Sequence, residues 1–208
     1  REYDREYSRI AGFPPSIKLT TIKPSGTLSL LAGVTPGAHP GFSEYYIRRI
    51  RMSADSELVG VCRQNGFDVE YVRNFDGTDD HSTVVVSFPC KFPKNTAFAE
   101  DMSAVDQLEV VKRLQAEWSD NSVSVTIYYR KNELDSIKAW LNDNYVNVKS
   151  VSFLLHNDHG FDQAPLEQID KKTYNSMKKR STPISSLRKI KMEDIEIDDC
   201  ATGACPVR

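Results

Sequence analysis

The sequence has few cysteines, no long apolar run and no excess of either charge sign. Only four cysteines occur among 208 residues, too few for a small secreted domain held together by disulfides. No run approaches the roughly 18 consecutive apolar residues of a transmembrane helix, so we expect no membrane partner. Lysine and arginine number 27 against 29 aspartate and glutamate, which gives no whole-chain signature of nucleic-acid binding. A reducing, cytoplasmic setting fits these absences.

The first residues also lack the features of an export signal. They are charged, beginning with Arg1 and Glu2, and contain no apolar segment. Position 1 is not methionine, so we expect a processed chain or a piece of a longer one. The apolar fraction of 39% is enough for one large domain, or for a domain followed by a tail.

The patterns of apolar residues predict strands that alternate with helices. The expected strands cover residues 16–22, 45–52, 82–88, 123–129 and 148–155, the third of them ended by Pro89. The expected helices are a short one that begins near residue 27 and longer ones over residues 54–66, 105–118 and 132–142. This alternation predicts an α/β fold with mostly parallel strand pairing over residues 1–165. Residues 166–208 are polar and highly charged, so we expect a flexible tail there.

The segment Lys23-Pro24-Ser25-Gly26-Thr27 lies between a predicted strand and a predicted helix. A helix N-terminus presents unpaired N–H groups to an anion, Gly26 permits close backbone approach, and Ser25 and Thr27 add hydroxyl donors. The segment is not a Walker phosphate loop, because the Gly-Lys-Ser/Thr ending is missing. The simpler alternative is that Ser25 or Thr27 only caps the helix.

Two of the four cysteines, Cys200 and Cys205, lie within the last nine residues. The four residues between them, one a glycine, let the chain turn until the Cα atoms reach the roughly 4.4–6.8 Å that a disulfide needs. Because the pair follows a polar tail, thiol–disulfide exchange is favoured over a structural bond. Zinc binding would need further ligands that the neighbouring sequence does not supply. Redox, metal-binding and incidental interpretations all stay open on the residues alone.

Several other residues give weaker signals. His39 could touch a phosphate, although a loop histidine is more often structural. Arginines at positions 48, 49 and 51 could contact an anion, although exposed strand charges are commoner. Cys62 and Cys90 are expected to be buried small side chains. Asp120 and Asn121 precede a predicted strand and are expected to form a turn.

Six segments, taken in order, resemble the monomeric adenosylcobalamin-dependent (class II) ribonucleoside-triphosphate reductases. They are TIKPSGTLSLLAG at 21–33, PGAHP at 36–40, YIRRIR at 46–51, DNSVSVT at 120–126, QAPLE at 163–167 and CATGACP at 200–206. Each is a moderate signal, and their shared order over nearly the whole chain is a strong one.

The resemblance implies the C-terminal portion of such a reductase, with a fold that supplies later strands of a ten-stranded α/β barrel. It implies that residues Pro24, Ser25, Gly26 and Thr27 bind the phosphates of a ribonucleoside triphosphate. It also implies adenosylcobalamin as cofactor, bound mainly by the complete enzyme, and the rest of the reductase chain as a partner. The pair Cys200 and Cys205 would reduce the active-site disulfide and be reduced in turn by thioredoxin.

One departure from the family is decisive. The Asn-x-Cys-x-Glu motif that carries the radical cysteine does not occur here, and neither Cys62 nor Cys90 has the neighbours of an active-site cysteine. No metal ligands are assigned, and we expect this chain to be inactive alone. Two other functions stay open: a nucleotide- or phosphate-binding module without redox activity, and a thioredoxin-linked redox adaptor that works through its tail.

Overall fold

The computed structural model describes residues 1–26, 28–156 and 162–185. The chain divides into two compact units that interleave in sequence. The first unit comprises residues 1–40 and 99–156, and the second comprises residues 41–98 and 157–208. The sequence-based boundary at residue 165 did not anticipate this interleaving.

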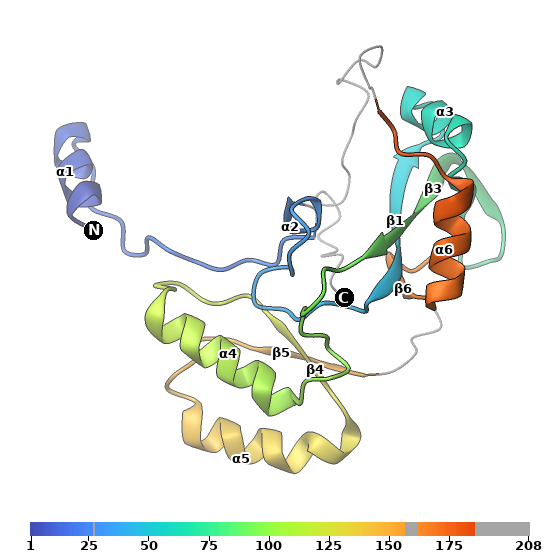
Figure 1. Cartoon of the computed structure of the whole chain (residues 1–208). Helices are drawn as coiled ribbons and strands as arrows, with labels where there is room; N and C mark the ends of the chain where they lie inside the picture. Colours follow the sequence, from blue (N-terminus) through green and yellow to red (C-terminus); the bar gives the residue numbers. More distant parts are fainter. Residues whose placement is uncertain (27, 157–161, 186–208) are drawn as a thin grey trace. The chain divides into compact units, whose positions relative to one another are not determined.

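The first unit contains parallel strands covered by helices (Figure 1). Its elements are α1 (Glu2–Ala11), α2 (Leu28–Leu31), α4 (Ala104–Glu117), β4 (Thr126–Tyr129), the 3-10 turn Lys131–Glu133, α5 (Leu134–Asn144) and β5 (Ser152–Leu155). Strands β4 and β5 pair in parallel, with α5 as the connection between them. Ile22 adds a parallel bridge to Val123, so three chain segments run side by side in one direction.

Helices α4 and α5 form because their apolar side chains recur on one face, which they bury against the strands. Ser103 begins α4 with a capping box: its hydroxyl accepts from the Asp106 N–H at 3.1 Å, and the Asp106 carboxylate accepts from the Ser103 N–H at 3.0 Å. The buried core of this unit consists of Ala38, Ala104, Leu108, Val111, Val123, Val125, Ile127, Ile137 and Trp140. The predicted helices over residues 105–118 and 132–142 are therefore confirmed.

The second unit is built on a four-stranded antiparallel sheet with strand order β2-β3-β1-β6. Its elements are β1 (Tyr45–Ser53), α3 (Glu57–Gln64), β2 (Asp68–Arg73), β3 (Asp79–Lys91), β6 (Leu166–Gln168) and α6 (Lys171–Arg180). Three consecutive valines at positions 84–86 of β3 are completely buried. Because successive side chains of a strand point to opposite faces, both faces of the sheet are covered at this point.

The QAPLE segment at residues 163–167 joins the strands of this sheet. The Gln163 amide accepts a hydrogen bond from the Arg73 N–H at 2.9 Å and donates one to the Tyr71 carbonyl at 2.8 Å, both on β2. Leu166 and Glu167 then pair with β1. The segment therefore connects the two outer strands, a structural role that its sequence did not reveal.

Four predictions about local structure need correction. Parallel pairing holds in the first unit but is wrong for the second. The strand predicted to end at Pro89 in fact continues to Lys91. Strand β2 begins opposite Ser87 and so leaves that side of β3 open beyond it, where a missing N–H is tolerated. Residues 16–22 form no regular strand beyond the Ile22 bridge. Regular structure also continues past residue 165, in β6 and α6.

Helix α6 forms in a stretch so polar that the sequence predicted none. Asp170 caps it, since its carboxylate accepts from the Thr173 N–H at 2.7 Å. Met177 is buried, the Tyr174 ring packs on Tyr45, and Arg180 makes two 3.1 Å bonds to Asp68 of β2. The helix is therefore held by tertiary contacts to the sheet. The α/β class itself is confirmed, while residues 186–208 of the tail predicted over residues 166–208 lie outside the described residues.

Candidate functional site

The candidate site begins where the extended segment 19–22 ends, at the Lys23-Pro24-Ser25-Gly26 loop of the first unit. Two backbone bonds fix this segment beside the chain that leads into β4. The Asn121 N–H donates to the Thr20 carbonyl and the Ser124 N–H donates to the Ile22 carbonyl, both at 2.9 Å. The loop therefore leaves the carboxyl end of a parallel segment, the edge at which open α/β sheets bind ligands.

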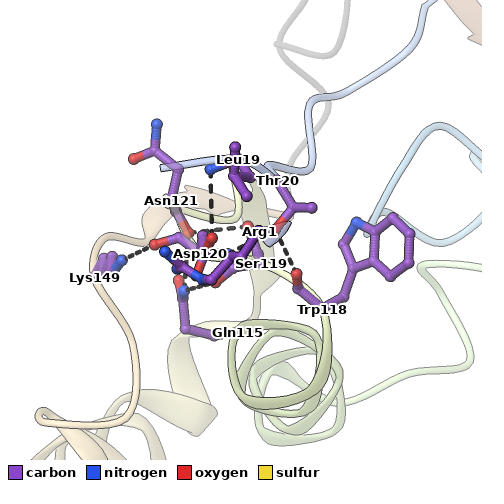
Figure 2. Close-up of polar contacts among 9 residues, drawn as sticks. All are labelled: Arg1, Leu19, Thr20, Gln115, Trp118, Ser119, Asp120, Asn121 and Lys149. Atoms are coloured by element: carbon purple, nitrogen blue, oxygen red, sulfur yellow. Dashed lines mark hydrogen bonds and ion pairs between the residues drawn. The ribbon is translucent and has the colours of Figure 1, made fainter. Parts of the chain in front are cut away.

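Asp120 and Thr20 hold the start of the same segment (Figure 2). The Thr20 hydroxyl donates to the Trp118 carbonyl at 2.6 Å and accepts from the Asp120 N–H at 3.0 Å. The Asp120 carboxylate accepts from the Leu19 N–H at 3.3 Å and pairs with Arg1 at 2.5 Å. The Arg1 guanidinium is the main cause of the lowered pKa of Asp120.

Two further side chains shape the turn that Asp120 begins. The Gln115 amide donates to the Ser119 carbonyl at 2.7 Å and to the Asn121 carbonyl at 2.8 Å, and the Lys149 ammonium donates to the Asp120 carbonyl. The predicted turn at Asp120 and Asn121 is confirmed. Its second role, as anchor for residues about a hundred positions earlier, could not be found from the local sequence.

The loop itself is half-buried at Pro24, Ser25 and Gly26. The Ser25 hydroxyl accepts from the Ser29 N–H at 3.1 Å, and the Ser29 hydroxyl donates to the Ser25 carbonyl. The capping interpretation is therefore correct for Ser25, although an accepting hydroxyl keeps its own proton to donate. Thr27 lies outside the described residues.

The helix that follows the loop, α2, is short. It spans four residues, so it adds little of the dipole that longer helices offer to an anion. Any anion held here would depend on the backbone N–H groups and hydroxyls of the loop.

A tight turn at residues 36–39 packs beside the loop. Gly37 has a φ of +64°, and a Cβ at this position would lie 2.5 Å from the Lys23 carbonyl oxygen. Only glycine fits this close approach without displacing the backbone. The PGAHP segment therefore contacts the first two residues of the candidate site.

His39, in the same turn, is 3% exposed. Its Nδ1 lies 3.0 Å from the Pro36 carbonyl oxygen, and its Nε2 accepts from the Thr126 N–H at 3.0 Å. Because the Thr126 N–H is a donor, Nε2 must be unprotonated and Nδ1 must carry the proton. Burial lowers the pKa of His39, and the Pro36 carbonyl raises it less. The structural interpretation of His39 is therefore confirmed.

A hollow of about 460 Å³ lies at the opposite, amino end of the parallel segments. Its cationic lining is Lys18, Lys112 and Lys149. Helices α4 and α5 both end beside this hollow, and their terminal carbonyl groups carry partial negative charge that attracts cations. The lysines are thus explained without a bound anion, and the loop at the carboxyl end is the better ligand site.

The cysteines and arginines of the second unit do not form a comparable site. Burial raises the pKa of both Cys62 and Cys90, which keeps these thiols protonated and unreactive near neutral pH. Arg48 is buried, and Arg49 donates to the Ala164 carbonyl at 3.0 Å and pairs with Glu167. The interpretation as exposed strand charges is therefore wrong for these two arginines and correct for Arg51.

Cys200 and Cys205 lie outside the described residues. Within residues 1–26, 28–156 and 162–185, no three His, Cys, Asp or Glu side chains gather closely enough to hold a metal ion. The same part of the chain contains no helix with the length and apolarity of a membrane span.

Comparison with solved structures places this fold among the ribonucleotide reductases. A crystal structure of a B12-dependent (class II) ribonucleotide reductase superposes with a TM-score of 0.73 and 34% identity, covering 88% of this chain and 25% of that one. No protein-family profile matches the chain.

Sequence comparison identifies the kind of ribonucleotide reductase that this chain resembles. The adenosylcobalamin-dependent ribonucleoside-triphosphate reductases of Lactobacillus acidophilus and Levilactobacillus brevis are each 35% identical over 99% of this chain. The chain is therefore homologous to a segment of the adenosylcobalamin-dependent ribonucleoside-triphosphate reductases, which confirms the resemblance found in its motifs. It spans 28% of the length of each of these two relatives.

Proposed function

We propose that this chain is the C-terminal segment of an adenosylcobalamin-dependent ribonucleotide reductase that converts ribonucleoside triphosphates to 2′-deoxyribonucleotides. The observation that carries the proposal is its homology, in sequence and in fold, to that family of reductases. Within the segment, we assign phosphate binding to Pro24, Ser25, Gly26 and Thr27, and electron delivery to Cys200 and Cys205.

The geometry of the loop supports the first assignment. It leaves the carboxyl end of a parallel segment, where backbone N–H groups are not used by strand pairing. Gly26 brings no side chain, so a phosphate oxygen can approach the backbone closely. The Ser25 hydroxyl can donate to that oxygen while it accepts from Ser29, and the neighbouring exposed Lys23 adds positive charge.

The cysteine pair would deliver electrons by thiol–disulfide exchange. A thiolate of the pair attacks the disulfide that forms in the active site at each turnover, and its partner thiol then displaces the mixed disulfide. The active-site cysteines leave as a dithiol, while Cys200 and Cys205 become a disulfide. The dithiol of thioredoxin reduces that disulfide by the same exchange, so two electrons and two protons move inward per turnover.

Adenosylcobalamin supplies the radical that starts the ribose chemistry. We assign the cofactor site mainly to the remainder of the reductase chain. The radical cysteine is assigned there as well, because the Asn-x-Cys-x-Glu motif is absent from this sequence.

The direct test of the function uses the full-length protein that contains this chain. Incubated with a ribonucleoside triphosphate, adenosylcobalamin and a dithiol, it should form the 2′-deoxynucleotide, and omitting adenosylcobalamin should abolish the product. A protein that binds the triphosphate but forms no deoxynucleotide would instead be a phosphate-binding module. Activity that persists without the cofactor would contradict its assignment to this class.

The test of the phosphate loop compares Gly26→Val with Ser25→Ala in the same enzyme. The valine side chain blocks approach to the backbone, so it should raise the substrate KM by about tenfold or more, the effect of losing one or two hydrogen bonds to a charged group. Ser25→Ala removes only one donor and should raise KM less. An unchanged KM for Gly26→Val would reject the site.

A further inference from the structure

The loop that we assign to substrate phosphates is supported from the side by the turn at residues 36–39. The turn makes two contacts, one with the loop and one with β4. Gly37 lies against the backbone of Lys23 and Pro24, and His39 is bonded to Thr126. The turn therefore lies between the loop and the first residue of β4.

The His39 end of this connection is rigid. Both the His39 N–H and its Nδ1–H donate to the Pro36 carbonyl, at 3.2 and 3.0 Å, which closes the turn. The ring then accepts the Thr126 N–H, and Thr126 is held in the sheet by its pairing with Ser152 of β5. Ala38, between the two residues, is part of the buried core. The turn cannot shift without breaking core packing and a buried hydrogen bond.

The Gly37 end leaves no room for adjustment. Its missing Cβ would lie 2.5 Å from the Lys23 carbonyl oxygen and 3.5 Å from the Pro24 Cα. The backbone of the loop therefore rests directly on the backbone of the turn. Any displacement of the turn is transmitted to Lys23 and Pro24 without an intervening flexible side chain.

We propose that His39 and Gly37 are positioning residues for substrate binding, which set the phosphate loop at a fixed place relative to β4. This inference rests on the proposed function, because it concerns the same loop. The neutral His39 ring holds the turn by accepting the Thr126 N–H. The backbone contact at Gly37 transmits the position of the turn to the loop. Neither residue contacts the reacting atoms.

The experiment uses the full-length reductase with three variants of matched size. His39→Leu keeps the side-chain volume but removes the acceptor, and His39→Gln supplies an amide oxygen near the Nε2 position. His81→Leu, at an exposed position of β3, is the control. Two quantities are measured with each: the KM of the ribonucleoside triphosphate, and the inhibition constant of inorganic tripolyphosphate.

His39→Leu should raise both constants by the same factor, about tenfold, as expected for one broken buried hydrogen bond, with kcat changed less than about twofold. His39→Gln should restore much of the loss, and His81→Leu should match the wild type. A lower kcat with an unchanged KM would mean a general loss of folded enzyme and would overturn the proposal, as would wild-type constants for His39→Leu.

Gly37→Ala provides an independent variant if His39→Leu does not fold. Its Cβ pushes on the Lys23 carbonyl, so both constants should rise as they do for His39→Leu, and wild-type constants would overturn the proposal. Gly26→Val distinguishes a failure of the loop assignment from a failure of the positioning role. If Gly26→Val leaves KM unchanged, the loop assignment itself fails; if it raises KM while the His39 and Gly37 variants do not, only the positioning role fails.

Discussion

Burial determines the protonation state of several side chains in this chain. The thiols of Cys62 and Cys90 have raised pKa values because burial disfavours the thiolate. The same effect keeps the His39 ring neutral, and only the neutral ring can accept the Thr126 N–H. These two cysteines and this histidine belong to residue types that are often reactive, but burial gives them structural roles here.

The state of His39 predicts how the stability of the first unit depends on pH. Its pKa in the folded chain is lower than in the unfolded chain, where it is about 6.5. The folded state therefore binds this proton less tightly, so stability is fully present above about pH 6.5 and is lost as the pH falls from there toward the folded pKa. His39→Gln should reduce the slope of unfolding free energy between pH 7 and 5.5.

Tryptophan fluorescence during urea unfolding can measure this slope, because both tryptophans of this chain, Trp118 and Trp140, lie in the first unit. His81→Gln, in the second unit, serves as the control and should keep the wild-type slope. The explanation fails if His39→Gln retains that slope too.

Two neighbouring valines on α4 differ in burial. Val111 is completely buried in the core, while Val110 is 38% exposed. Val111→Ala should lower the unfolding free energy of the first unit by about 2 kcal/mol, from the lost methyl groups and the cavity they leave. Val110→Ala should change it by less than about 0.5 kcal/mol. Equal effects, measured by the same fluorescence titration, would contradict the assigned core.

Helices α3 and α6 are joined at Gly66, which follows the end of α3. Gly66 has a φ of +77°, and a Cβ there would lie 2.3 Å from the Arg180 carbonyl oxygen at the end of α6. The Thr182 N–H also donates to the Asn65 carbonyl at 2.8 Å. Gly66, the last residue of the helix predicted over residues 54–66, is thus also the contact between two helices.

Two glycines separated by only six positions should therefore respond oppositely to alanine. Gly66→Ala adds left-handed strain and a backbone clash, and should destabilise the second unit by about 2 kcal/mol. Gly60 lies exposed inside α3 with no atom near its missing Cβ, so Gly60→Ala should stabilise it by about 0.5–1 kcal/mol. Hydrogen exchange of β3 amides measures both, and a stabilising Gly66→Ala would disprove the contact.

At the scale of the whole molecule, this chain is homologous to about a quarter of a larger reductase. Helix α1 has no buried residue, and its apolar side chains Tyr3, Tyr7 and Ile10 are exposed. We expect other parts of the complete reductase to cover these side chains.

The proposed electron path is tested in the complete enzyme with a Cys200→Ser, Cys205→Ser double variant. Multiple turnovers with thioredoxin should cease, while a single turnover from pre-reduced enzyme and activity with a small dithiol should survive. The matched control is Ala201→Ser with Ala204→Ser, which adds two serines to the same segment and keeps both thiols. Undiminished thioredoxin-driven turnover in the cysteine variant would remove the pair from the mechanism.

The melting temperature separates this role from a structural one. A disulfide between Cys200 and Cys205 closes only a small loop and adds little stability, so the double variant should melt at the wild-type temperature. A clear decrease would favour a structural disulfide.

Local sequence was enough to predict the elements whose side chains repeat regularly. Helices α4 and α5 and strand β1 follow from their apolar periods, and α3 lies within the helix predicted over residues 54–66. The ordered motifs were also enough to identify the reductases to which this chain is homologous, because each is a contiguous run of residues. The loop at Pro24–Gly26 was found in the same way.

Only the tertiary structure decided the contacts between residues far apart in the chain. Thr20 is held by Asp120, His39 by Thr126, and Gly66 by Arg180, across separations of about 90 to 115 residues. The antiparallel order of the second sheet and the existence of the polar helix α6 depend on contacts of the same kind. A local pattern records which face of an element is apolar, but not which distant backbone group that face will meet. The sequence by itself therefore determined the homology to the reductases and the regular elements, whereas long-range packing determined how the proposed phosphate loop is supported.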